Sequence, residues 1–205
     1  MVPTTRLEAF SDAVLAIIIT VMVLELRVPE GHDLRSFIDT TGHGLITYSL
    51  SFVYIGIYWN NHHHMFHLVR QVNGGILWAN LALLFFLSLL PFTTAWMDHS
   101  RLAPTPLFVY GLNLLLAAAV YYVLQTAVIR QEGPGSPLRQ AVGGDFKGKA
   151  SPFFYLAGMF SAILVDPHGR LGMWLALGFY AAVAILWVVP DRRIGRVVRE
   201  HGLPD

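Results

Sequence analysis

The sequence predicts an all-α polytopic membrane protein in which six transmembrane helices form a single domain over residues 1–205. Hydrophobic residues make up 55% of the chain and charged residues only 13%, whereas an ordinary soluble domain carries about 25% charged residues. The mean hydropathy is +0.53. Mostly apolar runs of about 20 residues, long enough to cross a hydrocarbon core of about 30 Å, occur six times along the chain. No connection between these runs is long enough to hold a soluble domain.

The first predicted helix, at about 6–26, begins in the charged strip RLEAFSD at residues 6–12. Thr5 and Glu8 have the Thr-x-x-Glu spacing of a capping box, which places the helix start here. Asp12 falls inside the predicted span, where an ionised side chain is costly and is usually retained for a partner or a function. We therefore expect Asp12 to find a polar partner on a neighbouring helix of its own subunit.

The next three helices are predicted at about 44–66, 75–97 and 105–129. The second ends in a polar run rich in asparagine and histidine. The third contains Pro91, which should free a backbone carbonyl and bend the helix. The fourth starts beside Pro106, a residue that suits the first turn of a helix.

The last two helices are predicted at about 151–166 and 170–189. The fifth is short and is stopped by an Asp-Pro pair at 166–167, so a tilted or partly re-entrant segment is an alternative to a full crossing. Pro152 suits its first turn. A loop rich in glycine and proline at 133–144 precedes it and should be flexible.

Six spans place both termini on one side of the membrane, and the distribution of lysine and arginine predicts which side. The side of the termini holds ten of the basic residues: Arg6, Arg70, Arg130, Arg139, Lys147, Lys149, Arg192, Arg193, Arg196 and Arg199. The other side holds four: Arg27, Arg35, Arg101 and Arg170. The excess predicts that both termini are cytoplasmic.

Aliphatic residues of the first helix form one stripe that points away from Asp12. With about 100° per residue, the stripe lies about 80° to 180° around the helix from Asp12. Its members are Ile17, Thr20, Val21 and Leu24. Packing in the core or against lipid is the usual role of such a stripe, so by itself it does not identify a pore.

Polar residues of the second and third helices lie at a depth comparable with that of Asp12. A network of carboxylate, indole, imidazole and amide groups would satisfy Asp12 and hold three helices together. The predicted partners of Asp12 are Trp59, His62, His63, Asn80 and Ser88. Whether His62 or His63 binds Asp12 stays open, because the two lie about 100° apart on the helix.

The histidine run also raises the question of a metal site, because His63 and His67 have i,i+4 spacing. Metal sites usually need three or four convergent ligands, and only Asp12 is nearby. We therefore expect no metal and no other cofactor; a pH-sensitive cluster suits the histidines better. The chain contains no cysteine, which excludes disulfides and thiolate catalysis.

Several short motifs occur in the first three predicted helices. The first helix carries Arg6-x-x-x-Phe10-Ser11-Asp12. The second carries Tyr58-Trp59-x-x-His62-His63-x-x-Phe66, and the third carries Trp78-x-Asn80 and Leu90-Pro91-Phe92-Thr93. These motifs resemble those of the bacterial homologues of the lysosomal potassium channel, transmembrane protein 175. The resemblance is clear for the first three spans and rests on topology for the rest.

The resemblance implies a homotetramer in a bacterial plasma membrane, with the first helix of each subunit around a central pore. It assigns the pore constriction to Ile17, Val21 and Leu24, and an influence on ion preference to Thr20. Arg6, Phe10, Ser11 and Asp12 would belong to the signature network. The implied partners are membrane lipid, K⁺ and other monovalent cations, and no nucleic acid. As in that family, the chain has no Thr-Val-Gly-Tyr-Gly filter sequence.

Three other functions compete with passive potassium conduction. A proton-coupled transporter, or a proton-permeable pathway, would use Asp12 and the histidines as a relay. A membrane enzyme would use the histidine cluster with Asp12 as acid or base, although paired carboxylates are missing from this region. A scaffold that does not conduct would make the aliphatic stripe important for assembly alone. Flux driven by a pH gradient would identify the transporter, and metal-dependent turnover would identify the enzyme. Substitutions in the stripe that affect only assembly would identify the scaffold.

Overall fold

The computed structural model describes residues 2–69, 71–133, 136, 138–139, 146–166 and 170–188. Over these residues the chain is almost entirely helical. The helices are α1 (Thr4–Leu24), α2 (Leu34–His67), α3 (Gly74–Ser88), α4 (Leu90–His99), α5 (Pro104–Glu132), α7 (Phe146–Leu164) and α8 (Leu171–Val188). The predicted all-α class is confirmed, and each of the six predicted spans corresponds to one helix or, for the third, to α3 and α4 together.

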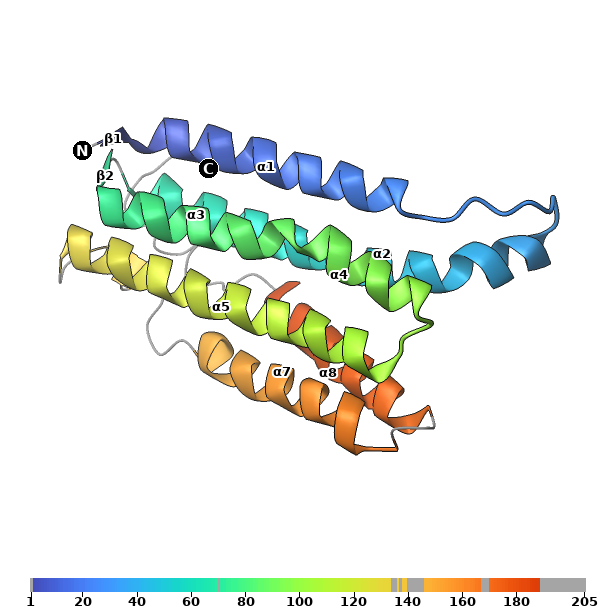
Figure 1. The fold of residues 1–205 in the computed structure, drawn as a ribbon. Coiled ribbons are helices and arrows are strands. Elements are labelled where there is room, and N and C mark those ends of the chain that lie inside the picture. Colours follow the sequence, from blue (N-terminus) through green and yellow to red (C-terminus); the bar gives the residue numbers. More distant parts are fainter. Residues whose placement is uncertain are drawn as a thin grey trace.

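The helices run alternately up and down in a layered bundle (Figure 1). α1 lies along one side of the bundle, where it contacts α2, α3 and α4. α7 and α8 lie on the far side, where they contact each other and α5. One long face of α1 consequently has no neighbouring helix among the residues that the structure describes.

The start of α1 differs from the prediction. The helix begins at Thr4, its N-cap residue is Pro3, and no side chain caps it. The capping box of Thr5 and Glu8 was therefore wrong, because both residues already lie within the first helical turns. Proline has no side-chain acceptor, so Pro3 cannot cap the free N–H groups of the first turn.

A short strand pair holds this end of α1 in place of the capping box. β1 (Val2–Pro3) pairs antiparallel with β2 (Gln71–Val72), which lies between α2 and α3. Next to this pair, the Thr4 hydroxyl donates to the carbonyl of Val69 at 2.9 Å. The start of the first helix is thus tied to the segment that joins the second and third spans.

α2 begins ten residues before the predicted span. The Asp33 carboxylate accepts a hydrogen bond of 2.8 Å from the backbone N–H of Ser36, which is an N-cap contact. The Thr41 hydroxyl also donates to the carbonyl of Arg27 at 2.7 Å, so the loop before the helix is fastened to it. The start of α2 therefore projects beyond the other helices (Figure 1).

The third span is interrupted as the proline predicts. α3 ends at Ser88, and α4 follows after Leu89 with Pro91 in its first turn. The side-chain amide of Asn113, on α5, donates to the carbonyl of Phe86 at 3.1 Å. A polar side chain of the neighbouring helix therefore supports the backbone at the interruption.

α7 starts five residues before the predicted fifth span, at Phe146. Pro152 lies inside this helix and not in its first turn, so that prediction was wrong. Most of the loop at 133–144 lies outside the described residues, as do Arg70 and the basic segment 192–199. The orientation that depends on those residues stays a prediction.

Four of the described helical segments are long and apolar enough to cross a membrane: Thr4–Leu24, Gly74–His99, Pro104–Glu132 and Leu171–Val188. α2 and α7 lie beside these segments and are more polar. α2 carries the histidine and asparagine run, and α7 begins with Lys147 and Lys149. Whether α7 fully crosses the membrane stays a prediction.

Buried tyrosines join α2, α5 and α8 in the middle of the bundle. The Tyr54 hydroxyl donates to the carbonyl of Tyr180 at 2.7 Å, and the Tyr180 hydroxyl donates to the carbonyl of Leu107 at 3.0 Å. A Cβ atom at Gly111 would collide with the Tyr180 hydroxyl. Since the lipid interior offers little hydrophobic drive between helices, such close packing and hydrogen bonding hold the bundle together.

Candidate functional site

One face of α1 packs inside its own subunit. Its buried side chains recur every three or four residues, which is the spacing of one helical face. They are Thr4, Leu7, Ser11, Leu15, Ile18 and Met22. Because α1 contacts α2, α3 and α4, this face fixes how the helix is rotated in the subunit.

The opposite face of α1 carries the predicted aliphatic stripe and is open. Ile17 is 60% exposed, Val21 40% and Leu24 81%. Thr20 is exposed as well, and its hydroxyl donates to the carbonyl of Ile17 at 2.8 Å. The hydroxyl hydrogen is thus used within the helix, while the oxygen keeps lone pairs that a cation could meet. The four stripe residues share one face of α1 that the described part of the chain leaves exposed.

A buried chain of hydrogen bonds joins α2, α3 and α1. Nε2 of His62 lies 2.8 Å from Oδ1 of Asn80, and because that oxygen accepts, Nε2 carries the hydrogen. The Asn80 amide donates to the Ser11 hydroxyl at 3.0 Å. The Ser11 hydroxyl donates to the carbonyl of Leu7 at 2.8 Å. The first two hydrogen bonds each join two different helices, so α2, α3 and α1 are held together at this level.

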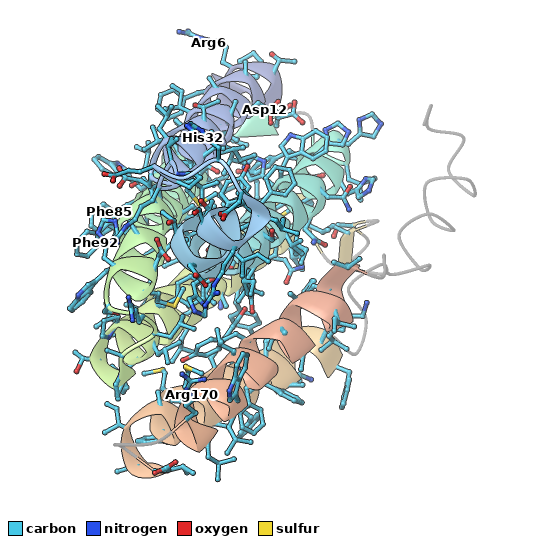
Figure 2. The ribbon with its side chains drawn as sticks, turned by 90° about the vertical axis from the view of Figure 1, so that its right-hand side faces the viewer. Arg6, Asp12, His32, Phe85, Phe92 and Arg170 are labelled. Atoms are coloured by element: carbon cyan, nitrogen blue, oxygen red, sulfur yellow. The ribbon has the colours of Figure 1, made fainter. Side chains whose placement is uncertain are left out.

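Asp12 lies outside that chain, on the exposed side of α1 (Figure 2). Its Oδ1 atom accepts a hydrogen bond of 3.0 Å from the indole N–H of Trp59. The ring of His63 stacks on Trp59 with centroids 6.0 Å apart and planes inclined by 19°. The predicted single network is therefore two: a buried chain through His62, and an exposed group through Trp59. Neither histidine is the hydrogen-bond partner of Asp12.

Three other predicted residues take no part in either group. Ser88 is exposed, and its hydroxyl donates to the carbonyl of Phe85 at 2.7 Å within α3. The side chains of Arg6 and Phe10 are exposed on α1. Arg6 lies near the end of α1, apart from Asp12 (Figure 2), and the described residues contain no ion pair between the two.

No group of three or more potential metal ligands occurs among the residues that the structure describes. The histidine run forms ring contacts: His63 lies 6.0 Å from His67 and 5.7 Å from His64, measured between ring centroids.

Two hollows flank α1, and both contain aromatic residues that sequence reasoning missed. One, of about 770 Å³, lies between α1 and α3–α4 and includes Ile17, Val21, Phe92 and Trp96 in its lining. The other, of about 650 Å³, lies between α1 and α2 and includes Phe52. Phe85 and Phe92 project from the same flank of the bundle (Figure 2). Phe52 and Trp96 escaped notice because an almost wholly apolar helix shows no polar side to mark which side chains are exposed.

Comparison with known proteins places the chain in a family. A family model described as the endosomal/lysosomal potassium channel TMEM175 matches residues 6–91. A potassium channel of Chryseobacterium sp. (strain P1-3) is 46% identical over 196 residues, which are 96% of this chain and 98% of the relative. The chain belongs to the TMEM175 family.

Two further members extend the comparison. The crystal structure of a lysosomal potassium-selective channel TMEM175 homolog from Chamaesiphon minutus matches with a TM-score of 0.74 and 27% identity, covering 92% of this chain and 97% of that one. The endosomal/lysosomal proton channel TMEM175 of Gallus gallus is 27% identical over 189 residues, which are 90% of this chain but 35% of the animal protein. The bacterial relative matches this chain almost end to end, whereas the animal relative is far longer.

The segment that matches the TMEM175 model covers α1, α2, α3 and the first turn of α4. It contains the open stripe of α1, the His62–Asn80–Ser11 chain and the Trp59–Asp12 pair. The resemblance that the sequence motifs suggested is therefore confirmed at the level of the family.

Proposed function

We propose that this TMEM175-family protein is a potassium-preferring cation channel of a bacterial plasma membrane. Four subunits would surround one pore, with the open face of α1 toward the axis. The observation that carries the proposal is the stripe of Ile17, Thr20, Val21 and Leu24, which the subunit leaves uncovered although three of its members are aliphatic. The bacterial relatives named as potassium channels support the choice of ion.

In the proposed pore, each stripe residue contributes to a ring of four identical side chains. Ile17 and Leu24 would be about 10 Å apart along the axis, at about 1.5 Å per residue. Narrow apolar rings of this kind resist wetting, so a small rotation of α1 could open or close the path. Val21 has a smaller side chain than its aliphatic neighbours and would make the middle ring wider.

Ion preference would arise at Thr20. An ion entering the apolar section must give up part of its hydration shell, and a hydroxyl oxygen is one of the few ligands available there. Because Thr20 donates its hydrogen to Ile17, its oxygen is oriented as an acceptor. A single ring of hydroxyl groups supplies far fewer oxygen ligands to a dehydrated ion than a complete carbonyl filter does. The preference for K⁺ over Na⁺ should therefore be modest.

The two hydrogen-bonded groups would support the pore helix. The His62–Asn80–Ser11 chain fixes α1 against α2 and α3 through buried contacts. Beyond Ser11, where the stripe lies, the buried side chains of Ile18 and Met22 would hold α1 in its orientation. With the basic residues on the side predicted from the sequence, both termini would be cytoplasmic.

Proton permeation is the second candidate, because the animal relatives are named as proton channels. Asp12 and the exposed rings of the histidine run are the groups that could carry it. The named functions of the relatives give less support to an enzyme, since they are channels.

The test is potassium flux and single-channel current from the purified protein in liposomes. Ile17→Asn and Leu24→Ala change the polarity or size of the proposed rings, and should alter conductance or selectivity severalfold. Ile19→Asn and Val23→Ala make the same kinds of change on another side of α1 and serve as matched controls. Currents that respond equally to both pairs would contradict a pore on this face.

A pH-sensitive dye inside the same liposomes distinguishes the second candidate. A flux of protons that does not depend on K⁺, and that is lost in Asp12→Asn, would favour a proton channel. If the wild-type protein is a folded tetramer but carries neither K⁺ nor proton flux, the proposal of a channel is contradicted.

A further inference from the structure

A crevice on the side of the bundle away from α1 has no role in the proposed pore. It has a volume of about 480 Å³ and opens between α2, α5 and α7, with the end of α8 beside it. Its volume lies within the range of small-molecule sites, about 300–1,000 Å³. The side chains that the argument uses are Tyr58, Asn61, Ala118, Lys149, Tyr155 and Trp187.

The crevice exists because aromatic rings hold α2 away from α5 and α7. Tyr58 on α2 meets Tyr121 on α5 with ring centroids 5.9 Å apart, and Tyr54 on α2 meets Tyr155 on α7 at 6.3 Å. Between these contacts α5 presents Ala118 and its neighbour Ala119, whose short side chains leave the space unfilled. The walls are consequently apolar and rich in aromatic surface.

Tyr58 offers a hydroxyl group to the crevice. Its side chain is only 8% exposed, yet its hydroxyl has no hydrogen-bond partner among the residues that the structure describes. The nearby Tyr54 shows the contrast, since its hydroxyl donates to a backbone carbonyl at 2.7 Å. Tyr58 lines the crevice, so its hydroxyl can reach a molecule bound there. An ester carbonyl or phosphate oxygen in the crevice would accept its hydrogen.

Polar residues gather at one end of the crevice. Asn61 lies near the end of α2, and the exposed Lys149 lies near the start of α7. Close by, the indole N–H of Trp187 donates to the Ser151 hydroxyl at 2.9 Å. Tryptophan, tyrosine and lysine are typical of the boundary between lipid tails and headgroups. Basic pockets between helices on the cytoplasmic side bind anionic headgroups.

We propose that this crevice binds one anionic glycerophospholipid. An acyl chain lies along the tyrosine walls, the headgroup phosphate meets Lys149, and Tyr58 donates to an oxygen of the lipid. The positive charge at the mouth and the apolar walls behind it select an amphiphile of negative charge over a neutral lipid or a free anion. This site is separate from α1, so it does not depend on the proposed conduction.

The experiment is native mass spectrometry of the purified protein in detergent, titrated with phosphatidylglycerol. Lys149→Gln should weaken binding about fivefold, the effect of one basic residue at an anionic surface. Tyr58→Phe removes the hydroxyl, keeps the ring and should weaken binding as well. Arg130→Gln removes the same charge from the exposed end of α5, outside the crevice, and should change binding less than about twofold.

A second pair of variants tests whether the crevice holds the acyl chain. Ala118→Phe should fill the crevice and abolish the tightest binding, whereas Leu116→Phe adds a ring on the exposed side of the same helix and should not. Equal binding of phosphatidylcholine, or equal loss in Lys149→Gln and Arg130→Gln, would overturn the proposal. Displacement of the lipid by glycerol phosphate or inorganic phosphate alone would show that the site takes a soluble anion and would overturn it too.

Discussion

The two faces of α1 have nearly the same composition and opposite surroundings. Ile18 and Met22 are buried against the other helices of the subunit, whereas Ile17, Val21 and Leu24 are open on the other side. In a soluble protein the open face would be polar. Here both faces are apolar, so the difference between them comes from packing alone. The buried face determines the rotation of α1, and that rotation decides which side chains face the proposed pore.

The largest effect on folding should come from truncating the buried face. Ile18→Ala should destabilise the subunit by about 2 kcal/mol or more, because it leaves a cavity that the neighbouring helices fill only in part. Ile17→Ala removes the same atoms from the open face and should have a much smaller effect on the unfolding of the subunit, while it changes conduction. Thermal unfolding in detergent measures the first difference and liposome flux the second. Equal destabilisation by the two variants would show that the faces are not distinct.

A smaller effect should follow from breaking the buried hydrogen-bond chain. Asn80→Ala leaves the polar groups of His62 and Ser11 without their partner and should cost about 1–2 kcal/mol. Asn61→Ala is the matched control, because the Asn61 amide donates only to Ile57 of its own helix. If unfolding of the two variants is indistinguishable, the chain does not hold α1 in place.

The smallest effect concerns the projecting start of α2. Hydrogen bonds from the hydroxyl and backbone N–H of Ser36 hold the pKa of Asp33 below its usual value. The contribution of this cap to stability is therefore fully present above the usual aspartate pKa of about 3.9, and is lost as the pH falls through the lowered value. The difference in melting temperature between wild type and Asp33→Ala should be small and constant above about pH 5, and should shrink below about pH 4. A difference that grows on acidification would contradict this cap.

The helices could be predicted from the sequence because long apolar runs leave few alternatives, but their ends could not. Hydropathy marked the apolar part of the second span from 44, whereas the helix starts at Leu34 because Asp33 caps it. At the first span, Pro3 and a strand pair replaced the capping box. Ends are decided by local hydrogen bonds, which a hydropathy pattern does not register.

Sequence reasoning predicted one polar network around Asp12, whereas the structure divides these residues between two groups. Sequence spacing placed Asp12, Trp59 and His62 at one level, but the rotation of each helix decides which atoms meet. With the observed rotations, Trp59 forms a hydrogen bond with Asp12, and His62 forms one with Asn80. Ser88 was predicted as a partner of Asp12, but its hydroxyl donates to the carbonyl of Phe85 within α3. The aromatic crevice was missed entirely, since it results from spaces between helices.

Cysteine accessibility along α1 tests the central claim most directly, because the chain contains no native cysteine. Single cysteines at Ile17, Val21 and Leu24 would be exposed to a cationic thiol reagent while current is recorded from liposomes. We predict that modification blocks the current at these three positions, and that cysteines at Ile18 and Met22 on the buried face are unaffected. Block at the buried positions, or full current after complete modification of the open face, would contradict a pore lined by this face.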